Sequence, residues 1–275
     1  MQTPAAPARP TRDELAAVGR KAAARYPDAV TAYLAGSLVE GYGNTQSDLD
    51  LFVLFAGAPP AAAGGGAAAA FDGAGIYRVD LDYTDGVRVD TECWPLPAVL
   101  DVAKRLNESP ADDWTAPVSL PEELFQLVHG IRIGMPVAAP AEFERVQAAF
   151  DWDHVCLLRY IRHMSVYTGS SEDAVGAVQA GDHGTALLTS REALGAAADA
   201  LLAAAGSTNT KPKWRFTKLR GIGRADLGDQ ILAAELDPDP APEALLARAK
   251  DRLRLASDLT LAAARAVGRL SGAPG

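Results

Sequence analysis

A polar turn between two apolar runs constrains this 275-residue chain more than any other feature. Residues 29–35 (AVTAYLA) are apolar without interruption, which is typical of a strand buried in the centre of a sheet. Gly36-Ser37 ends that run, and a polar loop leads to a second run at 48–55 (DLDLFVLF). The pattern predicts two buried strands joined by a loop, with two carboxylates at the start of the second strand.

Asp48 and Asp50 are those two carboxylates. Side chains at i and i+2 share one face of a strand, so the two carboxylates project together while the intervening leucines point into the core. Two carboxylates about 4 Å apart repel each other by roughly 4 kcal/mol at an effective dielectric of about 20, so the pair favours a cation between them. An Asp-x-Asp pair alone is often a solvated strand end, and the Gly-Ser turn upstream favours a metal site.

The rest of the first hundred residues predicts a helix and a hairpin. Thr11 and Glu14 form a capping-box pattern, which predicts a helix over 11–26. Residues 76–83 and 87–94 predict two strands joined by a turn that contains Asp-Gly, a favoured hairpin dipeptide.

The strand predicted at 87–94 carries further carboxylates. Its alternation places Asp90 and Glu92 on one face, together with an arginine and a tryptophan. An alternating polar face usually means solvent. In a sheet that already carries Asp48 and Asp50, however, one further carboxylate is what a divalent-metal cluster still lacks.

The composition changes after a linker-like stretch at 108–120. We predict an α+β fold, with a mixed sheet and flanking helices over 1–118, a flexible insertion rich in Ala, Gly and Pro at 56–75, and an all-helical domain over 119–275. No strand pattern reappears from residue 121 onward, and the helices are expected at 121–134, 140–168, 171–180, 182–205, 225–236 and 242–270.

Three segments, taken in order, resemble the motifs of the DNA polymerase β-like nucleotidyltransferase superfamily: Gly36-Ser37, Asp48-Leu49-Asp50 and Val87-Arg88-Val89-Asp90. The resemblance covers about residues 28–98 and implies a nucleotidyltransferase-type mixed sheet. In layout, the chain is similar to small-molecule nucleotidyltransferases of the antibiotic-modifying type, in which a helical domain that binds the acceptor follows the catalytic domain.

The resemblance implies that Asp48, Asp50 and Asp90 hold two Mg²⁺ ions, which in such sites lie about 3.5–4 Å apart. Transfer of a nucleotidyl group requires positioning and charge neutralisation at the α-phosphate more than covalent help. Glu92 shares the face with Asp90 and is the second choice for the third metal ligand, with a role as general base also open.

The same resemblance implies that Gly36, Ser37 and Ser47 contact the triphosphate of the nucleotide, since glycine permits close approach of the backbone and backbone N–H groups attract anions. Lys211 and Lys213 begin a segment with six basic residues in fourteen positions, similar to segments that contact the triphosphate in these enzymes. The alternative for this segment is an exposed basic loop around a buried tryptophan.

Arg159, Arg162 and His163 invite comparison with the Arg…His ribonuclease motif of HEPN domains. Their spacing does not fit that motif, and we interpret them as an arginine stripe on a helix surface.

The net charge of −9 argues against a free-standing DNA binder, which requires a basic surface. Cys93 and Cys156 are too few for a disulfide framework and are expected to be buried thiols. Residues 1–10 lack the apolar core of a signal peptide, and no apolar run approaches the ~18 residues of a membrane span, so a cytoplasmic location is expected. A monomer or homodimer is expected.

The first functional hypothesis is therefore an enzyme that uses ATP or another nucleoside triphosphate and Mg²⁺ to nucleotidylate a hydroxyl of a small molecule. The alternatives are nucleotidylation of a protein or tRNA, as in toxin–antitoxin pairs, and a non-catalytic nucleotide-binding module. The sequence does not distinguish a resistance enzyme from a biosynthetic one, and it names neither the acceptor nor the nucleobase.

Overall fold

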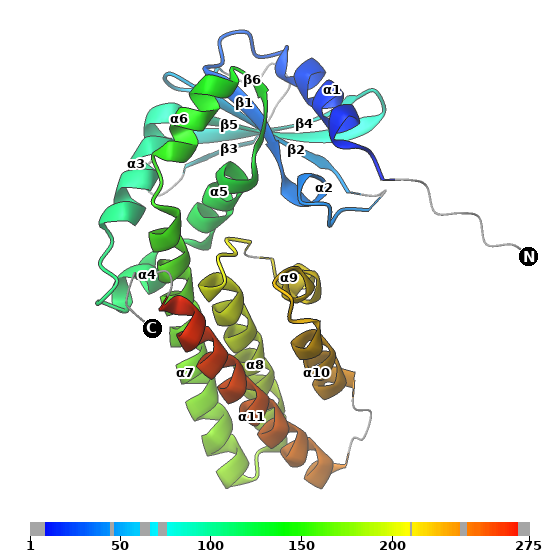
Figure 1. The fold of residues 1–275 in the computed structure, drawn as a ribbon, viewed down its shortest axis with the longest axis vertical. Coiled ribbons are helices and arrows are strands. Elements are labelled where there is room, and N and C mark those ends of the chain that lie inside the picture. Colours follow the sequence, from blue (N-terminus) through cyan, green and yellow to red (C-terminus); the bar gives the residue numbers. More distant parts are fainter. Residues whose placement is uncertain are drawn as a thin grey trace, which may run out of the picture. The chain divides into compact units, whose positions relative to one another are not determined.

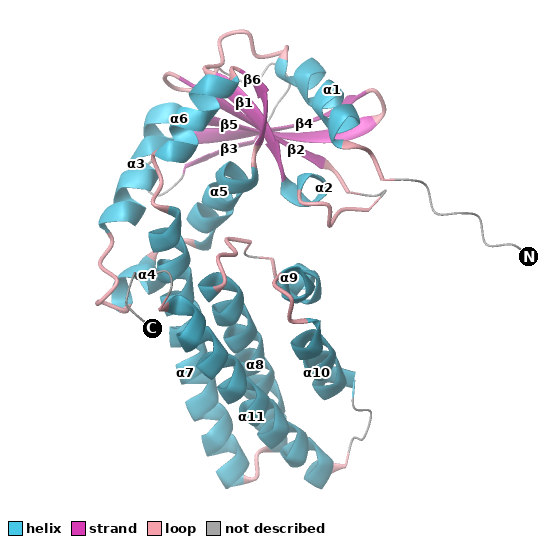
Figure 2. Ribbon diagram, in the orientation of Figure 1, coloured by secondary structure: helices cyan, strands magenta, loops and turns pink. Residues whose placement is uncertain are grey.

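The structure is a computed structural model that describes residues 9–44, 47–60, 67–70, 76–209, 211–236 and 241–268. The chain forms two compact units. The first comprises Met1–Leu106 and Gln126–Phe150, and the second comprises Asn107–Phe125 and Asp151–Gly275. The first contains a mixed sheet with helices and the second is helical, as predicted for the fold class (Figures 1 and 2).

The described residues of the first unit form one six-stranded sheet in the order β3-β4-β5-β2-β1-β6. The strands β2 and β5 run parallel, whereas the remaining neighbours pair antiparallel. The sheet comprises β1 (Thr31–Ala35), β2 (Leu49–Phe55), β3 (Ala67–Ala70), β4 (Ile76–Thr84), β5 (Val87–Pro95) and β6 (Met135–Ala138).

One face of this sheet packs against α1 (Arg12–Ala23). The predicted capping box is present, because the Thr11 hydroxyl oxygen accepts from the N–H of Glu14 and the Glu14 carboxylate accepts from the N–H of Thr11. Gly19 allows the helix to approach the sheet closely, since a Cβ there would lie 2.7 Å from Leu34 Cδ1. On the opposite face, Tyr33 stacks on Phe52 at a centroid distance of 5.1 Å.

The predicted hairpin between β4 and β5 is confirmed. Asp85 and Gly86 both have positive φ, at 52° and 79°, as a two-residue turn matched to the twist of its strands requires. Lys21 of α1 forms an ion pair with Asp85, and Arg25, just after that helix, forms one with Asp82. The two pairs link the end of α1 to the hairpin.

The predicted absence of strands after residue 121 is wrong. Met135–Ala138 forms β6 at the edge of the sheet, next to β1. This segment (MPVA) has only four residues and contains a proline, so it shows no strand period, and its pairing with β1 is a long-range contact. Residues 126–150 therefore belong to the sheet unit, and residues 107–118 belong to the helical unit. The units do not meet at a single boundary near residue 118, as the sequence had predicted.

The insertion predicted at 56–75 is described only at residues 56–60 and 67–70. Ala67–Ala70 forms the edge strand β3 against β4, which the alanine composition did not predict. Residues 61–66 and 71–75 of this prediction lie outside the described residues.

Three long helices form most of the second unit: α7 (Trp152–Ala180), α8 (His183–Ala204) and α11 (Pro242–Val267). The predicted break at Gly169 is wrong, because α7 continues through it. One glycine costs a helix only about 1 kcal/mol relative to alanine, which the packing of a 29-residue helix outweighs. The helix predicted over 140–168 is instead divided at Asp151, whose side chain accepts the N-cap hydrogen bond of α7.

The shorter elements are α2 (Gly36–Val39), α3 (Leu96–Glu108), α4 (Thr115–Ser119), α5 (Glu122–Ile133), α6 (Pro140–Ala148), η1 (Pro212–Trp214), α9 (Arg215–Gly221) and α10 (Ala225–Leu236). The linker-like stretch at 108–120 thus contains a short helix, α4. Helix α5 begins in the second unit and ends in the first.

Candidate functional site

The Gly-Ser turn follows directly from β1. Gly36 has a φ of 79°, a left-handed conformation that glycine adopts without strain, and it opens the four-residue helix α2. A Cβ at this position would collide with the carboxylate of Asp50. The carbonyl oxygen of Ser37 accepts hydrogen bonds from the N–H groups of Tyr42 and Gly43, at 2.8 and 2.7 Å. Residue 36 must therefore be glycine both for backbone conformation and for contact with Asp50.

Asp50 lies on β2, where Ala35 is its partner in β1 and Asp90 its partner in β5. Neighbouring residues of a parallel pair point to the same side of the sheet, so the two carboxylates share one face. This register brings together two of the predicted metal ligands and the end of β1, which Gly36 follows directly.

Arg88 links Asp48, the remaining predicted metal ligand, to Asp90 of this pair. Its Nε and Nη2 atoms donate to the two carboxylate oxygens of Asp90, both at 2.8 Å, and Nη2 also lies 3.9 Å from Asp48 Oδ2. The hydrogen bond to Asp90 raises the pKa of Arg88, and the charges of Asp90 and Asp48 add to the effect. The guanidinium supplies the shared positive charge that adjacent carboxylates require.

The three aspartates provide carboxylate oxygens, the ligands that Mg²⁺ prefers. Among the residues that the structure describes, however, no three His, Cys, Asp or Glu side chains are gathered as a ready ligand set. Both oxygens of Asp90 are held by Arg88. The carboxylate oxygens are of the type that binds a divalent cation. In this structure, however, the Arg88 guanidinium lies between Asp90 and Asp48.

Glu92 lies two residues further along β5, opposite Phe52 of β2. It accepts a hydrogen bond of 2.9 Å from the indole Nε1 of Trp94, which is buried. Burial, and secondarily the charge of Glu92, raises the pKa of Tyr33 well above its ordinary value. The roles of Asp90 and Glu92 as third metal ligand or base stay predictions. Of the two, only Asp90 is the register partner of Asp50 in the neighbouring strand.

Sequence reasoning missed a close contact between a carboxylate and a histidine beside the Gly-Ser turn. Glu40, the C-cap residue of α2, lies 3.3 Å from Nε2 of His129 on α5, and both side chains are largely buried. Burial and the nearby Glu40 raise the pKa of Tyr42. The pair connects the turn to α5, and its members are too far apart in sequence to leave a local signal.

The remaining predicted triphosphate contacts fall in different places. Ser47 accepts a hydrogen bond of 2.9 Å from the N–H group of Asn44, within the loop before β2. Lys211 and Lys213 are exposed and lie in the second unit, where the Lys213 ammonium is 5.2 Å from the ring centroid of Trp214. The part of both lysines in triphosphate binding stays a prediction.

A charged network holds this lysine segment to the helical bundle. Arg215 donates to both oxygens of Asp199, at 3.1 and 2.7 Å. Lys218 is buried and donates to the carbonyl oxygen of Asn209, at 2.9 Å. Burial raises the pKa of Asp199, but the hydrogen bond and charge of Arg215 outweigh this and lower it. Sequence periodicity does not indicate the Asp199–Arg215 pair, because Asp199 lies on α8 and Arg215 on α9.

The interpretation of Arg159 as part of a surface stripe is wrong. Arg159 is 2% exposed and forms hydrogen bonds to Glu122, both at 3.1 Å. Its Nη2 lies 2.9 Å from Nε2 of His163, and because arginine has no acceptor, this histidine nitrogen accepts. Burial, with the charge of Arg159, lowers the pKa of His163 to about 3. Arg159 therefore lies in the interior of the second unit rather than on its surface.

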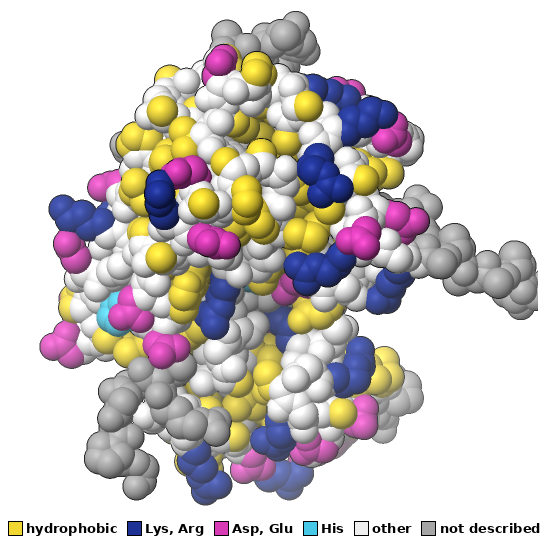
Figure 3. Space-filling view, turned by 45° about the horizontal axis from the view of Figure 1, so that its top comes forward, with side chains coloured by type: hydrophobic (Ala, Val, Ile, Leu, Met, Phe, Trp, Pro, Cys, Tyr) yellow, Lys and Arg dark blue, Asp and Glu magenta, His cyan; other side chains and the backbone are white. Residues whose placement is uncertain are grey.

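On the face drawn in Figure 3, lysine and arginine side chains of the described residues are interspersed with aspartate and glutamate. Among the described helices, none is long and apolar enough to cross a membrane. The two cysteines are buried, as predicted.

No family model and no curated protein matches the sequence. Among solved structures, the chain is similar to a nucleotidyltransferase-like protein from Exiguobacterium sibiricum, at 14% identity and a TM-score of 0.49. The alignment covers 94% of this chain and 78% of that one. At this identity and TM-score, the likeness identifies neither an activity nor a substrate.

Proposed function

We propose that the chain is a metal-dependent nucleotidyltransferase that moves a nucleoside monophosphate from a nucleoside triphosphate to a hydroxyl of a small molecule. The observation that carries this proposal is the packing of Asp50 against Gly36 together with its register opposite Asp90. A carboxylate pair beside a tight glycine turn suits a ligand that brings both negative phosphates and a counter-cation.

In the proposed reaction, the acceptor oxygen attacks the α-phosphorus, the bond to the bridging oxygen breaks, and pyrophosphate leaves. When bound, Mg²⁺ held by Asp48, Asp50 and Asp90 would neutralise the phosphates and activate the acceptor hydroxyl. The chain itself positions the triphosphate at the Gly36 turn and takes up the hydroxyl proton on a carboxylate of β5. Glu92 is the proposed acceptor of that proton, because Asp90 is assigned to the metal.

The test is to incubate the protein with each nucleoside triphosphate and Mg²⁺, adding candidate aminoglycosides, protein or tRNA, and to follow pyrophosphate. Pyrophosphate formed together with a labelled small molecule supports the proposal. Label found only on protein or tRNA rejects the small-molecule acceptor. If no acceptor yields pyrophosphate and Asp50→Ala binds triphosphate as the parent does, the enzyme proposal fails.

Separate exchanges of Asp90 and Glu92 distinguish the two acids. We expect Asp90→Asn to abolish pyrophosphate release and Glu92→Gln to retain part of it, because only Asp90 lies opposite Asp50. Full activity in Asp90→Asn with none in Glu92→Gln would reverse the assignment. Circular dichroism of both variants controls for folding, since Glu92 also accepts the hydrogen bond of Trp94.

A further inference from the structure

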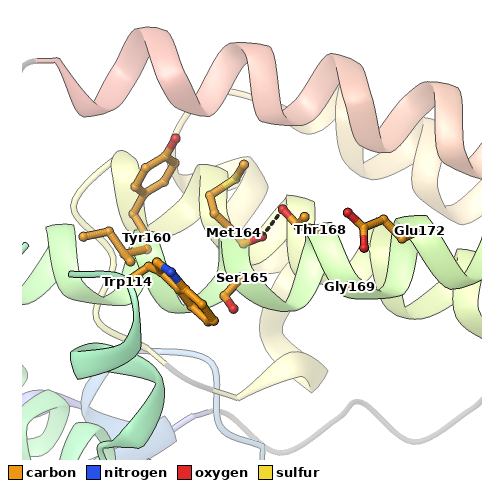
Figure 4. A pocket seen from close by; sticks show the side chains of 8 residues that line it. Trp114, Tyr160, Met164, Ser165, Thr168, Gly169 and Glu172 are labelled. Atoms are coloured by element: carbon orange, nitrogen blue, oxygen red, sulfur yellow. Dashed lines mark hydrogen bonds between the residues drawn. The ribbon is translucent and has the colours of Figure 1, made fainter. Parts of the chain in front are cut away.

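A cavity of about 540 Å³ lies in the second unit along one side of α7, opposite the start of α4 (Figure 4). Its volume is in the range of pockets that hold small organic ligands, roughly 300–1,000 Å³. The residues that give it its character are Trp114, Tyr160, Met164, Thr168, Gly169 and Glu172. None of the residues that the structure places in the lining is Lys, Arg or His.

One end of the cavity is apolar and aromatic. Trp114 is 61% exposed, which is unusual for a residue of this size, and it forms part of the cavity wall. Tyr160 and Met164 are partly buried and pack against the hydrophobic core of the helical unit, which holds these side chains in place. This end offers flat and polarizable surfaces for an aromatic ring.

The other end is polar and carries one negative charge. Thr168 donates its hydroxyl hydrogen to the carbonyl oxygen of Met164, at 3.0 Å, so it offers a ligand only an acceptor. Glu172 follows one helical turn later and presents an exposed carboxylate (Figure 4). Glu172 lies eight positions after Met164, which corresponds to about 12 Å along the helix axis.

Gly169 lies between these two ends, on the cavity side of α7. It is exposed, and a Cβ there would meet no atom within 4 Å. The missing side chain therefore keeps the cavity open in the middle of a helix that would be more stable with alanine at this position.

We propose that this cavity binds a small molecule with a flat apolar body and a cationic amine, the rings lying against Trp114 and the amine near Glu172. Charge complementarity selects this class, because the only formal charge in the described lining is the Glu172 carboxylate. The aromatic wall adds to the preference, since a cation near an indole or phenol face is attracted to it. The site lies wholly in the second unit and does not depend on the nucleotidyl-transfer proposal.

The test uses 9-aminoacridine, a planar cation at pH 8, and acridine, the same ring system without charge at that pH. Equilibrium dialysis against the full chain measures both. We expect 9-aminoacridine to saturate one site per chain and to bind about tenfold more tightly than acridine. The absence of saturable binding up to about 1 mM, or equal affinity for the two compounds, overturns the proposal.

Two glycine exchanges on the same helix test the location. Gly169→Leu fills the cavity and should weaken 9-aminoacridine binding at least about tenfold. Gly176→Leu is the matched control, because Gly176 is also exposed on α7, has open space around its Cβ and does not line the cavity. Leucine favours a helix over glycine, so both variants are expected to fold. Equal affinities of these two variants would place the ligand elsewhere.

The carboxylate has its own matched pair. Glu172→Gln should remove most of the preference for 9-aminoacridine over acridine, whereas Asp173→Asn, an exposed neighbour outside the lining, should retain it. An equal loss of preference in both variants would mean that the general negative charge of the surface attracts the cation, and would reject the proposed role of Glu172.

Discussion

Two bidentate arginine–aspartate pairs, one in each unit, have nearly the same geometry and different surroundings. Arg88 holds Asp90 with two contacts of 2.8 Å, and Arg215 holds Asp199 with contacts of 3.1 and 2.7 Å. The side chains of Arg88 and Asp90 are 49% and 21% exposed, whereas those of Arg215 and Asp199 are 21% and 12% exposed. The first pair is therefore more open to solvent and to ligands.

The charges around the two pairs differ as well. Asp90 lies opposite another carboxylate, Asp50, and shares its arginine with Asp48, so negative charge is in excess. Asp199 lies near Lys218 in addition to Arg215, and these cations lower its pKa in spite of burial. We infer that a bound cation can replace Arg88 at Asp90, and that the Arg215–Asp199 pair holds α8 and α9 together.

The largest expected effect is on the buried pair. Asp199→Ala leaves Arg215 without its carboxylate in a largely buried position, and we expect the free energy of unfolding to fall by about 3–5 kcal/mol. Urea denaturation followed by circular dichroism measures it. Asp226→Ala is the control, because Asp226 forms a similar pair with Arg224 on the surface, and its melting temperature should barely change. Similar losses in both variants would mean that burial does not distinguish the pairs.

The next effect concerns activity rather than stability. Asp50→Asn keeps the shape of the side chain beside Gly36 but removes its charge. If the carboxylate pair serves transfer, pyrophosphate release should fall at least about a hundredfold, roughly 3 kcal/mol in the transition state. The midpoint of urea unfolding should stay near that of the parent or rise, because two like charges no longer face each other. A large loss of stability would place Asp50 among the residues that hold the fold.

Sequence patterns predicted those parts of the molecule in which the partners are close in the chain. The Thr11–Glu14 capping box, the Asp85-Gly86 turn and the shared face of Asp90 and Glu92 all follow from spacings of three residues or fewer. Of the candidate site, Gly36 and the two carboxylates of β2 and β5 were predicted as residues. The position of Arg88 as a cation shared by Asp90 and Asp48 was not predicted, because the sequence does not show which positive group lies between the two carboxylates.

Contacts between distant segments left no such pattern. The Glu40–His129 and Asp199–Arg215 pairs and the pairing of β6 with β1 depend on how helices and strands pack, which periodicity does not encode. The continuation of α7 through Gly169 shows a second limit, since a local propensity of about 1 kcal/mol predicted a break that tertiary packing overrides.

The stability of the second unit is expected to depend on pH through His163, which lies near Asp199. Its pKa is lowered to about 3 in the folded chain by burial and by Arg159, against an ordinary value near 6.5. Below pH 6.5 the unfolded chain binds a proton that the folded chain does not, so the free energy of unfolding falls by about 1.4 kcal/mol per pH unit until pH approaches 3. His163→Gln, whose carbonyl oxygen can accept the Arg159 hydrogen bond without titrating, should have a flatter profile between pH 6 and 4. An unchanged slope would mean that His163 is protonated in the fold.

The smallest expected effect is on the exposed pair. Arg88→Met removes the contacts to Asp90 and Asp48, which are screened by solvent, so the melting temperature without metal should change by no more than about 2 °C. Asp48 and Asp90 then lack their shared cation. Adding Mg²⁺ should therefore raise the melting temperature more in Arg88→Met than in the parent, because a ligand that binds only the folded state stabilises it. Arg215→Met is the matched exchange in the second unit: it should lose stability strongly and gain nothing from Mg²⁺, because Asp199 has Lys218 rather than other carboxylates beside it. If Mg²⁺ shifts both variants equally, the two pairs have the same role, and the exposed one is not a cation site.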